Sequence, residues 1–136
     1  LFRCPIILTV AERSTARPLY WNDARPIAWP DAPYHLIAGE TALCHGLRAI
    51  PTPGHTPGHL SLLLTLPEGA VILAADAINR RSEPAEGFPD AMDPDTAAIS
   101  AARLHALQAE TDAVMIWGHD PDQWTALPKA PAPFRR

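Results

Sequence analysis

The chain has 136 residues, of which 47% are hydrophobic and 19% are charged, so it has the apolar content of one folded domain and a disordered chain is excluded. The formal net charge is -4, and Lys and Arg form no block, which argues against nucleic acid or an anionic membrane as a partner. No apolar run reaches the ~18 residues that a membrane span needs. The 16 prolines predict many loops and sharp stops.

The first predicted element is a strand over residues 5–10, because PIILTV is a continuous apolar run that contains β-branched residues. Such a run is typical of a strand in the interior of a sheet. Residues 11–33 carry four prolines and no periodicity, and we expect a loop there with one short helical turn. Because the chain starts almost directly on this strand and without an initiator Met, we expect a fragment that begins downstream of the natural N-terminus.

Short strands are predicted through the middle of the chain and once more near its end, over residues 34–38, 41–44, 47–50, 60–66, 71–75 and 113–117. The second and third of them flank a tight turn at His45-Gly46, in which Gly46 supplies a positive φ. Residues 51–58 (PTPGHTPG) can form neither a helix nor a regular strand, because proline lacks the backbone donor that both need.

One helix is predicted, beginning at Pro94 and ending near Glu110. Asp93 can cap its free amides, and proline suits the first helical position. Residues 79–92 before it are polar and contain Pro and Gly, so they are expected to form a loop. On the helix we expect a buried stripe made of Ile99, Ala102, Ala106 and Leu107.

This order of elements, strands first and then strand–helix–strand, predicts an α/β layered fold. The fully apolar strands 71–75 and 113–117 suggest a sheet that is covered on both faces. We assign residues 1–127 to one partial domain and residues 128–136 to an extended tail rich in Pro and Ala.

Three polar residues follow predicted strands or lie in the loops between them: His55, Asp76 and His119. Side chains at one edge of a layered sheet converge on a common crevice. Imidazole nitrogen and carboxylate oxygen are ligands of Zn²⁺ and similar divalent metals, and one carboxylate can bridge two ions. The alternative is that each is an ordinary loop residue with satisfied hydrogen bonds.

The local sequence around His55 is more specific. The string TPGHTPGH, residues 52–59, resembles the T-P-G-H-T-x-G-H segment of the metallo-β-lactamase-fold hydrolases. In that superfamily the first His of the string binds zinc, an Asp after two further strands bridges two zincs, and a His in a later Gly-His is another ligand. The resemblance places these ligands at His55, Asp76 and His119, in the family's order and at its intervals, and it extends to about Gln123.

Within the superfamily, the resemblance is greatest to the N-acyl-homoserine lactonase branch. The features that carry it are the Asp-Ala at Asp76, the Gly-His-Asp at His119 and the stretch Tyr34–Gly39. It implies part of an αββα sandwich with two Zn²⁺ in the complete site. Asp76 would be the catalytic bridging ligand, His55 would bind one zinc and His119 the other. The implied reaction is hydrolysis of a small-molecule ester, such as an N-acyl-homoserine lactone.

Two departures from the family leave alternatives open. The signature H-x-H-x-D-H is absent, so the chain would hold only the C-terminal portion of a site, and the isolated chain is expected to be inactive and poorly soluble. The lactonases carry a substrate-contacting Tyr three residues after the bridging Asp, where this chain has Asn79. The alternatives are a thioester hydrolase like glyoxalase II, or a non-catalytic relic if the chain is complete.

Other polar residues have expected supporting or structural roles. His59 is expected to lie behind the loop and support it, and Asp120 either orients His119 or caps the next turn. His105 is expected in solvent on the helix, His35 and His45 at an edge or turn, and Arg80-Arg81 on a solvated loop.

The two cysteines, Cys4 and Cys44, are expected to be small buried apolar residues with free thiols. Unpaired cysteines favour a reducing, cytoplasmic compartment. The sequence predicts no oligomeric state.

Overall fold

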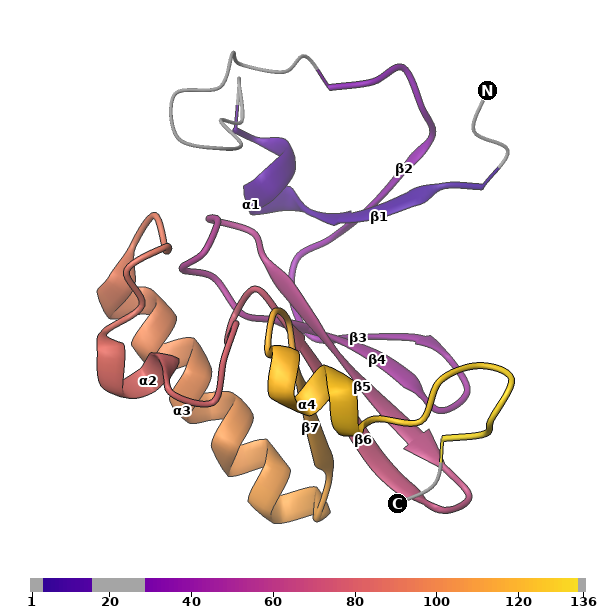
Figure 1. Cartoon of the computed structure of the whole chain (residues 1–136). Helices are drawn as coiled ribbons and strands as arrows, with labels where there is room; N and C mark the ends of the chain where they lie inside the picture. Colours follow the sequence, from indigo (N-terminus) through magenta and orange to yellow (C-terminus); the bar gives the residue numbers. More distant parts are fainter. Residues whose placement is uncertain (1–3, 16–28, 135–136) are drawn as a thin grey trace.

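The computed structural model describes residues 4–15 and 29–134, which form an α/β structure with one five-stranded sheet and a separate pair of strands (Figure 1). The strands are β1 (Ile6–Thr9), β2 (Tyr34–Ile37), β3 (Thr41–Cys44), β4 (Leu47–Pro51), β5 (Leu60–Leu66), β6 (Gly69–Ala75) and β7 (Val114–Trp117). The helices are α1 (Val10–Arg13), α2 (Glu83–Glu86), α3 (Pro94–Thr111) and α4 (Pro121–Ala126). No helix among these residues is long and apolar enough to cross a membrane.

The five-stranded sheet has the order β3-β4-β5-β6-β7. Its first four strands form an antiparallel meander, and β7 joins β6 in parallel after the crossover through α3. The predicted turn at Gly46 is confirmed, with a φ of 76°. Strands β4, β6 and β7 consequently run in the same direction, so their C-terminal ends lie at one edge of the sheet.

Helix α3 begins and ends close to where the sequence predicts. Asp93 caps it through a hydrogen bond from the Thr96 amide, and Pro94 occupies the first turn. The predicted buried stripe is wrong, because Ile99 is 73% exposed. The helix instead turns a face of small side chains and one Leu toward the sheet, namely Ala97, Ser100, Ala101 and Leu104. In a helix this rich in alanine, apolar spacing alone does not identify the buried face.

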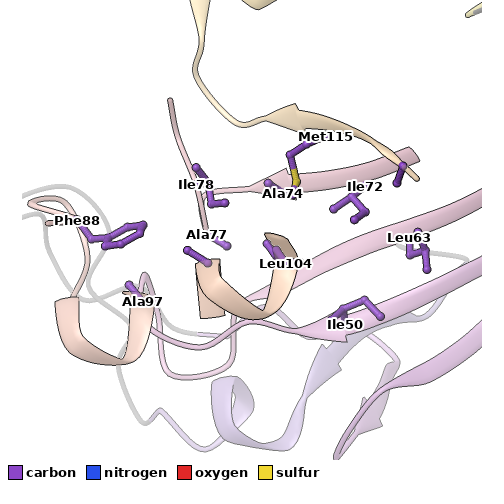
Figure 2. Packing of buried hydrophobic residues seen from close by; sticks show 12 residues of the cluster. Ile50, Leu63, Ile72, Ala74, Ala77, Ile78, Phe88, Ala97, Leu104 and Met115 are labelled. Atoms are coloured by element: carbon purple, nitrogen blue, oxygen red, sulfur yellow. The ribbon is translucent and has the colours of Figure 1, made fainter. Parts of the chain in front are cut away.

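The core lies between this face of α3 and one face of the sheet (Figure 2). Ile50, Leu63, Ile72 and Met115 supply its sheet side, and all are at most 3% exposed. The opposite face carries half-buried residues such as Leu62 and Leu73. Within the described residues, complete cover on both faces is therefore not observed.

The first predicted strand is not an interior one among the described residues. β1 pairs in parallel with β2 in a two-stranded sheet, and Ile7 and Leu36 are 38% and 45% exposed. Val10 already belongs to α1, which supplies the expected helical turn. Cys4 and Cys44 are exposed rather than buried, because Cys4 precedes β1 and Cys44 lies on the edge strand β3.

Two further short helices were not expected. α2 lies within the predicted loop 79–92, where Gly87 ends the helix in the left-handed conformation with a φ of 80°. α4 follows β7 directly and is capped by Asp120. Both helices are too short to show a periodicity that a sequence pattern would reveal.

Candidate metal centre

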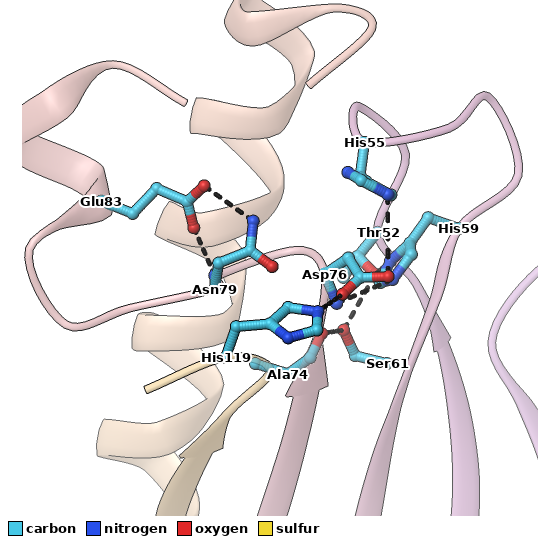
Figure 3. Close-up of polar contacts among 9 residues, drawn as sticks. All are labelled: Thr52, His55, His59, Ser61, Ala74, Asp76, Asn79, Glu83 and His119. Carbon is cyan, nitrogen blue, oxygen red and sulfur yellow. Dashed lines mark hydrogen bonds and ion pairs between the residues drawn. The ribbon is translucent and has the colours of Figure 1, made fainter. Parts of the chain in front are cut away.

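The shared edge of the sheet brings three predicted residues together. His55 lies in the loop after β4, Asp76 directly follows β6, and His119 follows β7 (Figure 3). The two carboxylate oxygens of Asp76 face different rings. Oδ1 is 2.9 Å from His119 Nε2, and Oδ2 is 3.6 Å from His55 Nε2.

The loop that carries His55 is fixed from one side by α3. The Gly54 carbonyl accepts a hydrogen bond from the Asp93 amide at 3.0 Å, and the Ser100 hydroxyl donates to the Pro53 carbonyl at 2.6 Å. Gly54 has a φ of +135°, and a Cβ there would lie 2.4 Å from the backbone N and Cα of Ala97. Only glycine allows this close approach of loop and helix.

The same loop is fixed from the other side by α1. The Gly58 amide donates to Glu12 Oε2 at 2.9 Å, and the Thr9 hydroxyl donates to the Gly58 carbonyl at 2.9 Å. Thr9 and Glu12 are not among the predicted site residues. Thr-x-x-Glu is the pattern of a helix-capping box, and the Glu12 amide indeed donates to Thr9 Oγ1. That pattern could have located α1, although not its contact with the loop.

Asp76 follows an irregular end of β6. Ala75 has a φ of 49°, which is rare for a residue with a side chain, and the pairing of β6 with β7 shifts between Leu73 and Ala75. Gly118 packs directly against this bend, since a Cβ there would lie 2.5 Å from the Ala75 carbonyl oxygen. The bend and the close contact together bring the loops of Asp76 and His119 side by side.

His59 lies behind Asp76 and connects it to the sheet. Burial lowers the pKa of the His59 imidazole below its ordinary 6.5, while the nearby charge of Asp76 raises it to a smaller extent. The ring is therefore neutral at pH 7 and has one donor and one acceptor nitrogen. Because the Asp76 amide donates to Nε2 at 3.2 Å, the proton is assigned to Nδ1.

From His59 Nδ1 the hydrogen bonds continue in one direction into the sheet (Figure 3). Nδ1 donates to the Thr52 hydroxyl at 2.8 Å, which donates to the Ser61 hydroxyl at 2.9 Å, which donates to the Ala74 carbonyl at 2.8 Å. Thr52 and Ser61 are fully buried. This relay ties the loop before β5 to the end of β6.

We predict that Thr52→Val destabilises the protein by about 1–3 kcal/mol, because it leaves the donor of His59 and the hydroxyl of Ser61 without their buried partner. Thr65→Val, on an exposed position of β5, is the matched control and should change stability by less than about 0.5 kcal/mol. Urea unfolding followed by circular dichroism measures both variants. Equal stability of the two variants would contradict the relay.

Asp120 and Asn79 support the loop of His119. Asp120 Oδ1 accepts from the Gln123 amide at 2.8 Å and Oδ2 from the Arg81 amide at 3.2 Å, and these hydrogen bonds lower the pKa of Asp120. Of its two expected roles, the structure therefore shows the helix cap. Asn79 is 5% exposed, and its carbonyl accepts a hydrogen bond from the His119 amide at 2.8 Å. A substrate contact by Asn79 stays a prediction.

The remaining histidines and the arginine pair lie away from this site or face solvent. His35, His45 and His105 are exposed, and His105 Nδ1 lies 3.4 Å from Gln108 Oε1. Arg80 forms an ion pair with Glu86 at 2.7 Å, and Arg81 is exposed.

The nitrogen and oxygen donors of His55, Asp76 and His119 imply a metal ion, and the arrangement of their side chains shows how well such an ion would fit. Within residues 4–15 and 29–134, no group of three or more His, Cys, Asp or Glu side chains is arranged to hold a metal ion. The side chains instead form two pairs that share Asp76, with one carboxylate oxygen toward each Nε2. His55 Nδ1 is buried and has no partner within these residues, so Nε2 is the accessible nitrogen of that ring. The chemistry of these donors fits Zn²⁺, which takes imidazole nitrogen and carboxylate oxygen as ligands, and His55, Asp76 and His119 would hold it.

Comparison with known proteins defines the family. Residues 3–119 match the model of the metallo-beta-lactamase superfamily, so the chain belongs to this superfamily and its α/β fold is part of the metallo-β-lactamase fold. An N-acyl homoserine lactonase of Bacillus cereus is 32% identical over 123 residues, which cover 88% of this chain and 48% of that protein. The N-acyl homoserine lactonase AttM of Azorhizobium caulinodans is 40% identical over 105 residues. These residues cover 72% of this chain and 37% of that protein.

A solved structure of an N-acyl homoserine lactone hydrolase, with the product N-hexanoyl-L-homoserine bound at its catalytic metal center, superposes with a TM-score of 0.81. Its sequence identity is 26%, and the match covers 94% of this chain and 52% of that one. The matches thus span between 37% and 52% of the length of these relatives.

Proposed function

We propose that the protein is a metal-dependent hydrolase that opens the ester bond of a lactone, with N-acyl homoserine lactones as its substrate class. The observation that carries this proposal is the position of Asp76, which directs one carboxylate oxygen to His119 Nε2 and the other to His55 Nε2. The lactonase relatives and the product-bound structure support the choice of substrate.

In this proposal His55 and His119 would each hold one zinc ion, and Asp76 would be the ligand that the two ions share. Zinc bound there would supply a Lewis acid and lower the pKa of a coordinated water toward neutrality. The chain's own residues hold the three ligands in place. α1 and α3 fix the loop of His55 from two sides, and the relay through His59 fixes the backbone of Asp76.

Asn79 is the proposed contact for the substrate carbonyl. One N–H of its side-chain amide donates to Glu83 Oε1 at 2.9 Å, so the contact would be made by the second N–H. Compared with the phenol of a tyrosine, this donor has a shorter reach and no aromatic face. We therefore expect the protein to select its lactone with fewer contacts at this position than a tyrosine would provide.

The full-length protein, purified with zinc, tests the proposal in a proton-release assay with N-hexanoyl-L-homoserine lactone. We expect hydrolysis that a chelator abolishes and added Zn²⁺ restores. S-lactoylglutathione is the comparison substrate, and faster turnover of this thioester would overturn the lactone assignment. A full-length protein that binds no zinc and hydrolyses neither substrate would overturn the hydrolase assignment and favour a non-catalytic role.

A further inference from the structure

The carboxylate of Glu83 is buried beside the candidate metal centre and makes two hydrogen bonds to a single residue. Glu83 is 1% exposed, although it lies on the short surface helix α2. Its Oε1 accepts from the Asn79 side-chain amide at 2.9 Å, and its Oε2 accepts from the Asn79 backbone amide. Burying a carboxylate costs free energy unless hydrogen bonds compensate for the lost water. Both hydrogen bonds that compensate Glu83 come from Asn79, so moving Asn79 would leave the carboxylate unpaired, and Asn79 is held in place.

Asn79 in turn holds the loop of His119. The Asn79 carbonyl accepts from the His119 amide at 2.8 Å, and the preceding Ile78 carbonyl accepts from the Gly118 amide at 3.1 Å. A shift of Asn79 would therefore shift His119. His119 depends on this support because its ring is largely exposed, with a side-chain exposure of 69%.

The neighbouring charges have other partners. Arg80 is paired with Glu86, and the hydrogen bond and charge of Glu86 raise the pKa of Arg80. Glu86 lies on the same helix but is exposed and contacts solvent. Glu83 therefore differs from Glu86, the exposed carboxylate of the same helix, because Glu83 is hydrogen-bonded to Asn79.

We propose that Glu83 is a positioning residue that holds Asn79 and, through the Asn79 carbonyl, keeps His119 Nε2 directed at Asp76. This inference rests on the proposed metal centre and goes beyond it, because it assigns a role to a residue outside the ligand set. Glutamine at this position could accept only one of the two hydrogen bonds and would direct an NH₂ group at the other Asn79 donor.

The test is a Co²⁺ titration of the full-length protein, its Glu83→Gln variant and the matched control Glu86→Gln, followed by visible absorption. For Glu83→Gln we expect the Co²⁺ equivalent bound by His119 to weaken about 10–100-fold, with an altered spectrum, while the other equivalent keeps its affinity. Glu86→Gln should titrate like the unchanged protein, because that ion pair is exposed.

The outcomes separate this inference from the proposed function. If the unchanged protein binds no Co²⁺, the metal centre itself is wrong and the role of Glu83 falls with it. If the unchanged protein binds two equivalents and folded Glu83→Gln binds both equally well, the positioning role alone is overturned.

Should Glu83→Gln fail to fold, the double variant Glu83→Gln/Asn79→Asp restores the side-chain hydrogen bond with donor and acceptor exchanged. This double variant should fold and recover the spectrum of the unchanged protein. A folded double variant that still lacks the second equivalent would contradict the proposal.

Discussion

Replacing Asp76 with Asn is expected to lower kcat/KM of the full-length protein for the proposed lactone substrate by about 10³-fold or more, equivalent to roughly 4 kcal/mol of transition-state stabilisation. The amide keeps the shape of the carboxylate but offers one acceptor oxygen and no charge, so it cannot serve both histidines. One of the two rings would then face the NH₂ group of Asn instead of a carboxylate oxygen.

Zinc content, measured by elemental analysis, should fall in Asp76→Asn together with the activity. Asp90→Asn is the control, since Asp90 is an exposed acidic residue in the loop between α2 and α3. Activity and zinc content that survive Asp76→Asn would contradict the bridging role, whereas an equal loss in Asp90→Asn would point to a general effect of charge.

Gly54→Ala is expected to reduce the free energy of unfolding by about 2–5 kcal/mol. Its Cβ would lie 2.4 Å from backbone atoms of α3, which cannot move aside like a flexible side chain, and its φ of +135° is strained for any residue with a side chain. His55 would be displaced with the loop, so zinc affinity should fall as well.

Gly39→Ala provides the matched control for Gly54→Ala. A Cβ at Gly39 would meet nothing within 4 Å, and stability should stay within about 1 kcal/mol of the unchanged protein. Thermal and urea unfolding compare the two variants. A Gly54→Ala protein as stable as Gly39→Ala would show that the contact between the loop and α3 is not as close as described.

The strands and the long helix could be predicted because they depend on short stretches of sequence, and the structure confirms these local features. Asp93 and Pro94 mark the start of α3, and Gly46 marks the hairpin turn, because capping and positive φ depend on a few adjacent residues. The convergence of His55, Asp76 and His119 was also predictable, since these residues follow strands that run in one direction.

The remaining features depend on tertiary contacts that no local pattern encodes. The buried face of α3 is set by the fit of Ala97 and Ala101 against the sheet, whereas the larger Ile99 faces solvent. Glu12 and Glu83 look like surface residues in sequence, yet each is buried where its carboxylate accepts hydrogen bonds from a loop of the site. A pattern of charge and hydrophobicity predicts that such glutamates are exposed, because the hydrogen-bond donors that allow their burial come from elsewhere in the fold.

The most direct test of the central claim is anomalous X-ray scattering at the zinc absorption edge from crystals of the full-length protein. We predict two peaks, one between an Asp76 oxygen and His55 Nε2 and one between the other oxygen and His119 Nε2, each at about 2.0–2.2 Å from its ligand atoms. Crystals grown with zinc that show no anomalous peak at Asp76, with its carboxylate still hydrogen-bonded to His119, would contradict the account.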